Sequence, residues 1–117
     1  MTIVSQILVG LVALLHLYFL VLEMFLWTTP RGRATFGTTK EFAEESKGLA
    51  ANQGLYNGFL VAGLVWGLVD DQTDVLVFFL SCMIVAGLYG AATVNKRIVF
   101  VQAVPAALAL AAVLVAA

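Results

Sequence analysis

Four apolar stretches, each about as long as a bilayer core is thick, constrain the fold of this chain more than any single motif. They are expected to form membrane-spanning helices over residues 3–27, 49–69, 75–94 and 98–115. The composition agrees, because 62% of the 117 residues are hydrophobic and 11% are charged, whereas a soluble domain is about half apolar and about a quarter charged. The chain is therefore predicted to be all-α, a single domain (1–117) forming a four-helix transmembrane bundle.

The segments between the predicted spans carry turn and cap signals. Residues 28–46 are the one long polar stretch, and Thr-Thr-Pro-Arg-Gly-Arg at its start predicts the end of the first helix and a turn. Thr38 followed by Glu41 fits a capping box, so the second helix is expected to begin near Thr39 and to run unbroken into the membrane. Pro105 lies inside the last apolar stretch and predicts a kink there.

The basic residues indicate the orientation of the predicted bundle. With four spans, the first loop and the turn at 95–97 share one face of the membrane, and the acidic turn at 70–74 lies on the other. All six Lys and Arg belong to the first face: Arg31, Arg33, Lys40, Lys47, Lys96 and Arg97. The positive-inside rule then predicts that loops 28–46 and 95–97 are cytoplasmic and both termini outside, in a multi-pass protein of the plasma (inner) membrane.

Polar side chains inside the predicted spans gather at similar depths. Counting about 1.5 Å of rise per helical residue from the cytoplasmic ends, residues from all four spans fall in the cytoplasmic half of the bundle, while the outer half is almost wholly apolar. These residues are Glu23, Asn52, Gln53, Tyr56, Asn57, Tyr89 and Gln102, with His16 at mid-depth. They predict a polar pocket that faces the cytoplasm.

Glu23 and His16 are the candidate catalytic residues of this pocket. Glu23 is the one acid within any predicted span, and His16 is the one histidine of the chain; ionisable groups inside a membrane are functional candidates. Because they lie about 10 Å apart along the helix, they cannot pair directly, but they could line two walls of one cavity. They would serve as acid and base toward a small lipophilic ligand, with the amides and tyrosines as ligand-binding residues.

Glu23, His16 and the amides also fit roles without catalysis. Glu23 could be held by an amide or tyrosine of the second helix, and His16 could bond Tyr56 or Asn57, since polar groups often connect membrane helices. At the level of function, one alternative is a small proton-coupled transporter in which Glu23 cycles between protonation states. The other is a structural or accessory membrane subunit whose polar face seals the bundle.

Several classes of partner are disfavoured or left open. One histidine, one glutamate and several amides are a poor ligand set for zinc or copper, so no metal site is predicted and a cofactor stays unknown. The net charge of −1 argues against nucleic acid. Cys82 is alone and is expected to be a small apolar core residue. Gly54 and Gly58 lie opposite the polar face, so they are expected to contact another helix or subunit, which favours a dimer or trimer.

Two motifs in this sequence resemble a known family. The first begins at the histidine, His16-x-Tyr18-x4-Glu23-Met-Phe-Leu-Trp27, with Pro30, Gly32 and Phe36 after it, and the second is Ala50-Ala-Asn-Gln-Gly-Leu-Tyr-Asn-Gly-Phe59. Together they resemble the domain-of-unknown-function family thirteen-oh-four (DUF1304), small and mostly bacterial four-helix membrane proteins. The resemblance covers nearly the whole chain and implies an integral membrane protein, with no activity attached to it.

Overall fold

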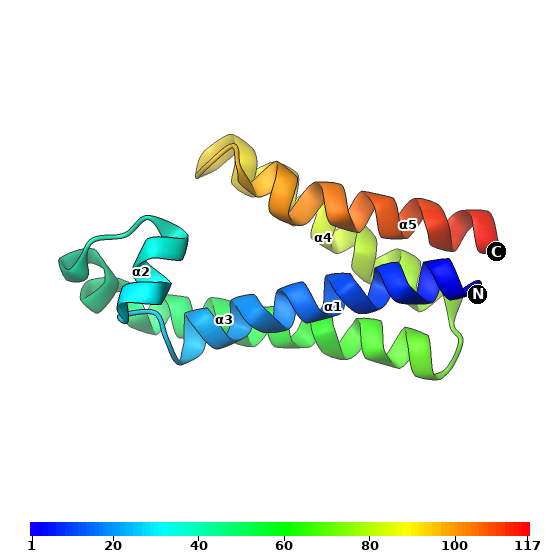
Figure 1. Cartoon of the computed structure of the whole chain (residues 1–117), viewed down its shortest axis with the longest axis horizontal. Coiled ribbons are helices and arrows are strands. Elements are labelled where there is room, and N and C mark those ends of the chain that lie inside the picture. The colour runs from blue at the N-terminus through cyan, green and yellow to red at the C-terminus, as the bar shows by residue number, and fades with distance from the viewer. The chain divides into compact units, whose positions relative to one another are not determined.

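The computed structural model describes all 117 residues, and they form an all-α fold. Five α-helices and one π-helical turn follow one another along the chain (Figure 1): α1 Ile3–Met24, α2 Pro30–Phe36, α3 Lys40–Val69, α4 Thr73–Thr93, the π turn Val99–Ala103 and α5 Val104–Ala116. The residues group into two compact units, one formed by Met1–Leu14 with Ala62–Ala117 and the other by Leu15–Val61. The all-α prediction is confirmed.

Three of the helical segments are long and apolar enough to cross a membrane: Ile3–Met24, Thr73–Thr93 and Val99–Ala116. They coincide with three of the four predicted spans. The helix α3 is the longest, with 30 residues, but it is not among the three. Its first turns are charged, and the amides of Asn52, Gln53 and Asn57 lower the hydropathy of the rest.

The stretch that was expected to be a polar loop contains the short helix α2. Thr29 is its N-cap, and the Thr29 side chain accepts a hydrogen bond from the Gly32 amide. Pro30 occupies the first turn, where its missing N–H leaves no bond unmade. Gly37 ends the helix in the left-handed conformation, with φ of 67°. The Thr-Thr-Pro signal that predicted the end of one helix therefore also starts another.

The helix α3 begins at Lys40, as the sequence predicted, but a different threonine caps it. The Phe42 amide donates to the Thr39 hydroxyl at 3.1 Å. The Thr38 hydroxyl is buried and has no hydrogen-bond partner. The prediction of Thr38 as the cap was wrong by one residue, because two adjacent threonines precede the helix and only the backbone geometry selects between them.

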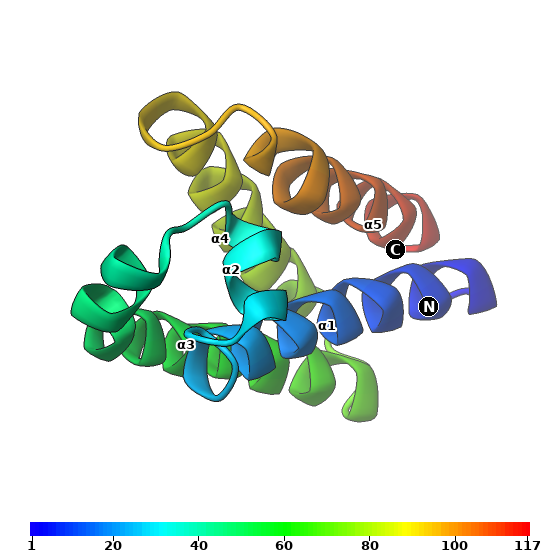
Figure 2. The same ribbon diagram turned by 60° about the vertical axis from the view of Figure 1, so that its left-hand side comes forward.

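Within the unit that contains the C-terminus, α4 and α5 pack side by side, and the views in Figures 1 and 2 agree on this. Leu76, Leu80 and Met83 of α4 are fully buried. A Cβ at Gly87 would lie 2.7 Å from the Ala103 backbone nitrogen, so this glycine allows the π turn to approach α4 closely. The π turn ends two residues before Pro105, where the kink was predicted, and the ring's missing N–H disturbs the helical ladder there.

Candidate functional site

Glu23 of α1 and Asn57 of α3 form a buried pair within the Leu15–Val61 unit. The Asn57 Nδ2 group donates to Glu23 Oε1 at 2.5 Å. Glu23 is 8% exposed and Asn57 is 6% exposed. A carboxyl group is costly to bury unless hydrogen bonds replace those it made to water, and the amide supplies one. The alternative in which an amide of the second helix holds Glu23 is therefore realised.

Two glycines allow α1 and α3 to approach closely enough for this bond. A Cβ at Gly54 would lie 2.5 Å from Met24 Cγ and 3.2 Å from Glu23 Cβ. One turn later, a Cβ at Gly58 would lie 3.0 Å from a methyl carbon of Leu20. This glycine pair contacts another helix, as predicted, since it packs against α1 on either side of Asn57.

The other polar residues of α3 do not join the pair. Asn52 and Gln53 are exposed, and Tyr56 is 55% exposed and packs edge-on against Phe59 with ring centroids 5.7 Å apart. Of the four polar side chains that the sequence placed on one broad face, Asn57 alone is buried. The hydrogen bond to Glu23 therefore depends on one amide of the second helix, not on the whole set.

The remaining predicted residues differ in how deeply each is buried in its own unit. His16 is fully buried and meets the ring of Phe19 edge-on, with centroids 5.7 Å apart. Tyr89 and Gln102 belong to the other unit, where Tyr89 is 71% exposed on α4 and Gln102 is half-buried on the π turn. The contact that joins the predicted residues Glu23 and Asn57 lies wholly within the Leu15–Val61 unit.

Sequence reasoning missed a second polar contact, between Tyr18 of α1 and Arg31 of α2. Arg31 Nε donates to the Tyr18 hydroxyl at 3.1 Å, and the guanidinium carbon lies 5.7 Å from the centroid of the Tyr18 ring. The signal was present, since Tyr18 stands inside the first motif and the Pro-Arg-Gly turn was recognised. The contact between Arg31 and Tyr18 could not be predicted without α2, because this helix brings Arg31 back toward α1.

The Glu23–Asn57 pair can perform acid–base chemistry in apolar surroundings. A carboxyl group can donate or accept a proton, while an amide N–H that donates to Oε1 fixes the orientation of the group. The exposed fraction of Glu23 is small, so a partner of this carboxyl must be small or must reach it through the surrounding apolar side chains.

Comparisons with known proteins agree with the resemblance seen in the two motifs. The sequence matches the family described as "Protein of unknown function (DUF1304)" over residues 10–114. It is also similar to "Uncharacterized protein YpaA" of Lactococcus lactis subsp. lactis (strain IL1403), with 37% identity over 114 residues that cover 94% of this chain and 96% of the relative. No solved structure matches. The resemblance predicted from the sequence is confirmed.

Proposed function

This chain belongs to the DUF1304 family, and we propose that it is a four-span membrane protein that binds or converts a small lipophilic ligand at Glu23. The observation that carries the proposal is the hydrogen bond between the buried side chains of Glu23 and Asn57, on two helices whose surroundings are apolar. Ionisable groups within membrane spans are rare and commonly mark sites of function, and Glu23 belongs to the apolar helix α1, one residue before its end.

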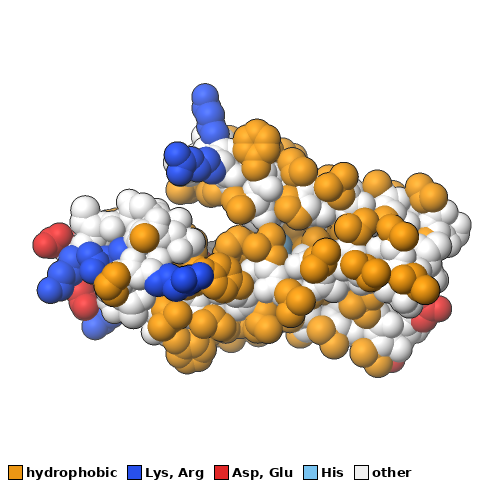
Figure 3. Space-filling model, viewed as in Figure 1, with side chains coloured by type: hydrophobic (Ala, Val, Ile, Leu, Met, Phe, Trp, Pro, Cys, Tyr) orange, Lys and Arg blue, Asp and Glu red, His pale blue; other side chains and the backbone are white.

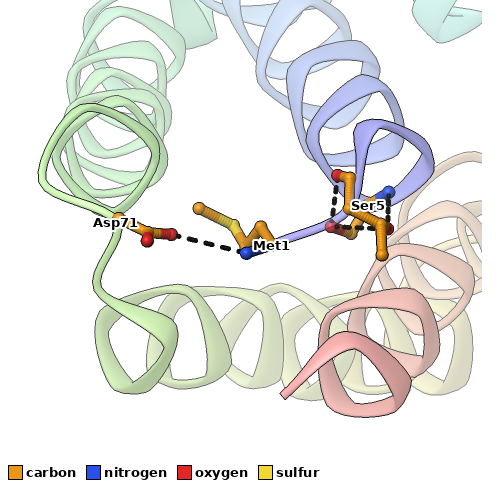
Figure 4. A network of polar contacts seen from close by, with 4 residues as sticks. Met1, Ser5 and Asp71 are labelled. Atoms are coloured by element: carbon orange, nitrogen blue, oxygen red, sulfur yellow. Dashed lines mark hydrogen bonds and ion pairs between the residues drawn. The ribbon is translucent and has the colours of Figure 1, made fainter.

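A contact near the N-terminus supports a crossing by α3 as well as by α1. The amino group of Met1 lies 3.7 Å from an Asp71 carboxylate oxygen (Figure 4). If α1 crosses the membrane, the chain after Met24 starts on the face opposite Met1, and it must recross to bring Asp71 back. The 30 residues of α3 span about 45 Å at about 1.5 Å per residue, which is ample for a bilayer core.

The distribution of charge supports the proposed orientation. On the face drawn in Figure 3, apolar side chains cover the long helices, and Lys and Arg side chains gather around α2 and at the turn between α4 and α5. In a four-span arrangement both basic segments face the cytoplasm by the positive-inside rule. Both termini and the acidic turn at 70–74 then face outward from the plasma (inner) membrane.

The proposed topology predicts a specific labelling pattern for single cysteines. In a Cys82→Ser background, a membrane-impermeant maleimide should label Gln72→Cys on intact cells. Thr35→Cys and Lys96→Cys should be labelled only after the cells are opened, although all three positions are exposed in the fold. Equal labelling of positions 35 and 72 from the same side would contradict a crossing by α3.

Glu23 is suited to meet a ligand that arrives through the lipid. Asn57 occupies one carboxyl oxygen, and the apolar side chains around the pair favour a lipophilic partner over a hydrophilic one. His16 is a second titratable group on the same helix, buried and deeper in the proposed span. In this mechanism Glu23 exchanges a proton with the polar end of the ligand, and Asn57 holds the carboxyl in place.

A purely structural role for the Glu23–Asn57 pair is the alternative, and the Glu23→Gln variant distinguishes it from a role in ligand binding. Glutamine has the size of glutamate, and its amide oxygen can still accept the bond from Asn57 Nδ2. The substitution should therefore leave the free energy of unfolding almost unchanged while removing the acid. If the pair is purely structural, Glu23→Gln should change neither the stability nor the function of the protein, whereas an acid–base site should lose its activity.

We expect dicyclohexylcarbodiimide, a lipophilic reagent for protonated carboxyl groups in apolar surroundings, to modify Glu23 in membranes and to leave the Glu23→Gln variant unmodified. A water-soluble carbodiimide is the control, because the other six acidic residues are exposed and should react with it instead. Mass spectrometry of peptides locates each adduct. Organic extracts of the two purified proteins should differ in a bound lipophilic compound.

The proposal fails if Glu23 is inert to the lipophilic reagent and the extracts of the wild type and Glu23→Gln are identical. Modification of Glu23 with identical extracts would leave an accessible acid without a retained ligand, and would favour the transporter alternative. Protein stability is measured in parallel, so that a loss of bound compound is not mistaken for a loss of fold.

A further inference from the structure

Arg31 is held in place by Tyr18 but keeps most of its hydrogen-bonding capacity. Its Nε donates to the Tyr18 hydroxyl at 3.1 Å, and its guanidinium carbon lies 5.7 Å from the centroid of the ring. A guanidinium has five N–H donors, and this contact uses one of them. The hydroxyl accepts that bond, so its own hydrogen can still be donated. The two side chains therefore present several donors toward an acceptor at the surface.

The helix that carries Arg31 is firmly docked on the turn that follows α1. Gly32 is buried, and a Cβ at this position would overlap the backbone carbonyl of Leu26. Trp27 packs on Phe36 with ring centroids 4.9 Å apart and donates from Nε1 to the Ser46 hydroxyl at 3.0 Å. The backbone beneath Arg31 is thus fixed before any ligand binds, which reduces the entropy lost on binding.

Tyr18 belongs to an exposed stripe of α1 that is otherwise apolar. Leu14 is 63% exposed, and a spacing of four residues places it on the same helix face as Tyr18. Phe25, which follows directly after α1, is 70% exposed. Tyr18 lies six residues before Met24, which is about 9 Å from the helix end. The guanidinium of Arg31 therefore reaches back from α2 over a surface suited to lipid, close to the level of the head groups.

We propose that Arg31 and Tyr18 bind the phosphate of an anionic phospholipid in the cytoplasmic leaflet. The positive charge selects an anion, and the planar guanidinium can bind two phosphate oxygens at once, while the Tyr18 hydroxyl donates to a third. The apolar stripe around Tyr18 accommodates the acyl chains, which a free phosphate ion lacks. The choice of leaflet rests on the proposed membrane orientation, and anionic lipids are abundant there.

The test titrates phosphatidylglycerol, with phosphatidylcholine as the neutral comparison, into the purified protein in detergent and counts bound lipids by native mass spectrometry. Arg31→Gln should weaken the tightest phosphatidylglycerol site about tenfold and leave phosphatidylcholine binding unchanged. Arg31→Lys keeps the positive charge but loses the planar guanidinium that can bind two oxygens, so its affinity for phosphatidylglycerol should lie between those of the wild type and Arg31→Gln. Tyr18→Phe should weaken the site about threefold through the lost hydroxyl.

Lys40→Gln is the matched control, because it removes one exposed positive charge from the same basic segment and should change the affinity less than twofold. Equal losses in Arg31→Gln and Lys40→Gln, or no loss in either, would overturn the proposal. Competition by millimolar inorganic phosphate would show an anion site without a lipid requirement, and would also overturn it. Detergent micelles have no sidedness, so this result is independent of the topology and of Glu23 reactivity.

Discussion

Gly54→Val is expected to destabilise the packing of α1 on α3 by about 3 kcal/mol. The first carbon of the new side chain would lie 2.5 Å from Met24 Cγ and 3.2 Å from both Glu23 Cβ and the Leu20 carbonyl oxygen. The Met24 side chain can move, but a backbone carbonyl cannot move without shifting its helix. The two helices must therefore separate, which also lengthens the Asn57–Glu23 hydrogen bond.

Equilibrium unfolding in mixed micelles of SDS and a non-ionic detergent measures this free energy. Trp27 fluorescence in a Trp66→Phe background confines the signal to the Leu15–Val61 unit. Gly48→Val is the matched control, because Gly48 lies on the same helix with no atom within 4 Å of an added Cβ. It should be neutral or slightly stabilising, since glycine is a poor helix former. Similar losses at both positions would contradict close packing at Gly54.

Asn57→Leu is expected to destabilise the same unit by about 2 kcal/mol, because it removes the donor to a buried carboxyl group. Leucine has the same number of side-chain heavy atoms as asparagine and the same branch point, so the main change is the loss of the hydrogen-bond donor. The effect should be seen as a lower midpoint in the same unfolding titration. No loss of stability in Asn57→Leu would show that Glu23 does not depend on this amide.

The double variant Glu23→Leu/Asn57→Leu tests whether the two groups act on each other. Replacing both partners of a buried hydrogen bond by apolar groups can be nearly neutral, so the double variant should be more stable than Asn57→Leu alone. A coupling free energy of about 1–2 kcal/mol is expected from polar pairs between membrane helices. Strict additivity of the two single changes would contradict a direct pair.

The helices could be predicted well because their signals are local. Apolar runs as long as a bilayer core, with turn residues between them, predicted all four long helices to within a few residues of the observed bounds. The errors occurred where two local signals competed. Thr38 and Thr39 both fit a helix cap, and Thr-Thr-Pro can end one helix and begin the next, so the local signal does not distinguish α2 from a loop.

The candidate site was predicted in part: the sequence indicated which residues belong to it, but not which of them contact one another. The sequence singled out Glu23 and Asn57, but it also included Asn52, Gln53 and Tyr56, which are exposed in the fold. Helical periodicity gives the angles between side chains on one helix, and these four polar residues of α3 extend over about 140° at about 100° per residue. Helical periodicity does not, however, give the direction in which a neighbouring helix lies.

The helical class, the family and the presence of an acid and amides within apolar segments therefore follow from the amino-acid sequence alone. That Asn57, among the polar residues of α3, is the one that meets Glu23 depends on how the helices pack. The physical reason is close approach: Gly54 and Gly58 are the positions at which α3 can lie against α1, and Asn57 stands between them. The same holds for Arg31 and Tyr18, which are related by no helical spacing and which meet because Gly32 lets α2 dock on the turn after α1.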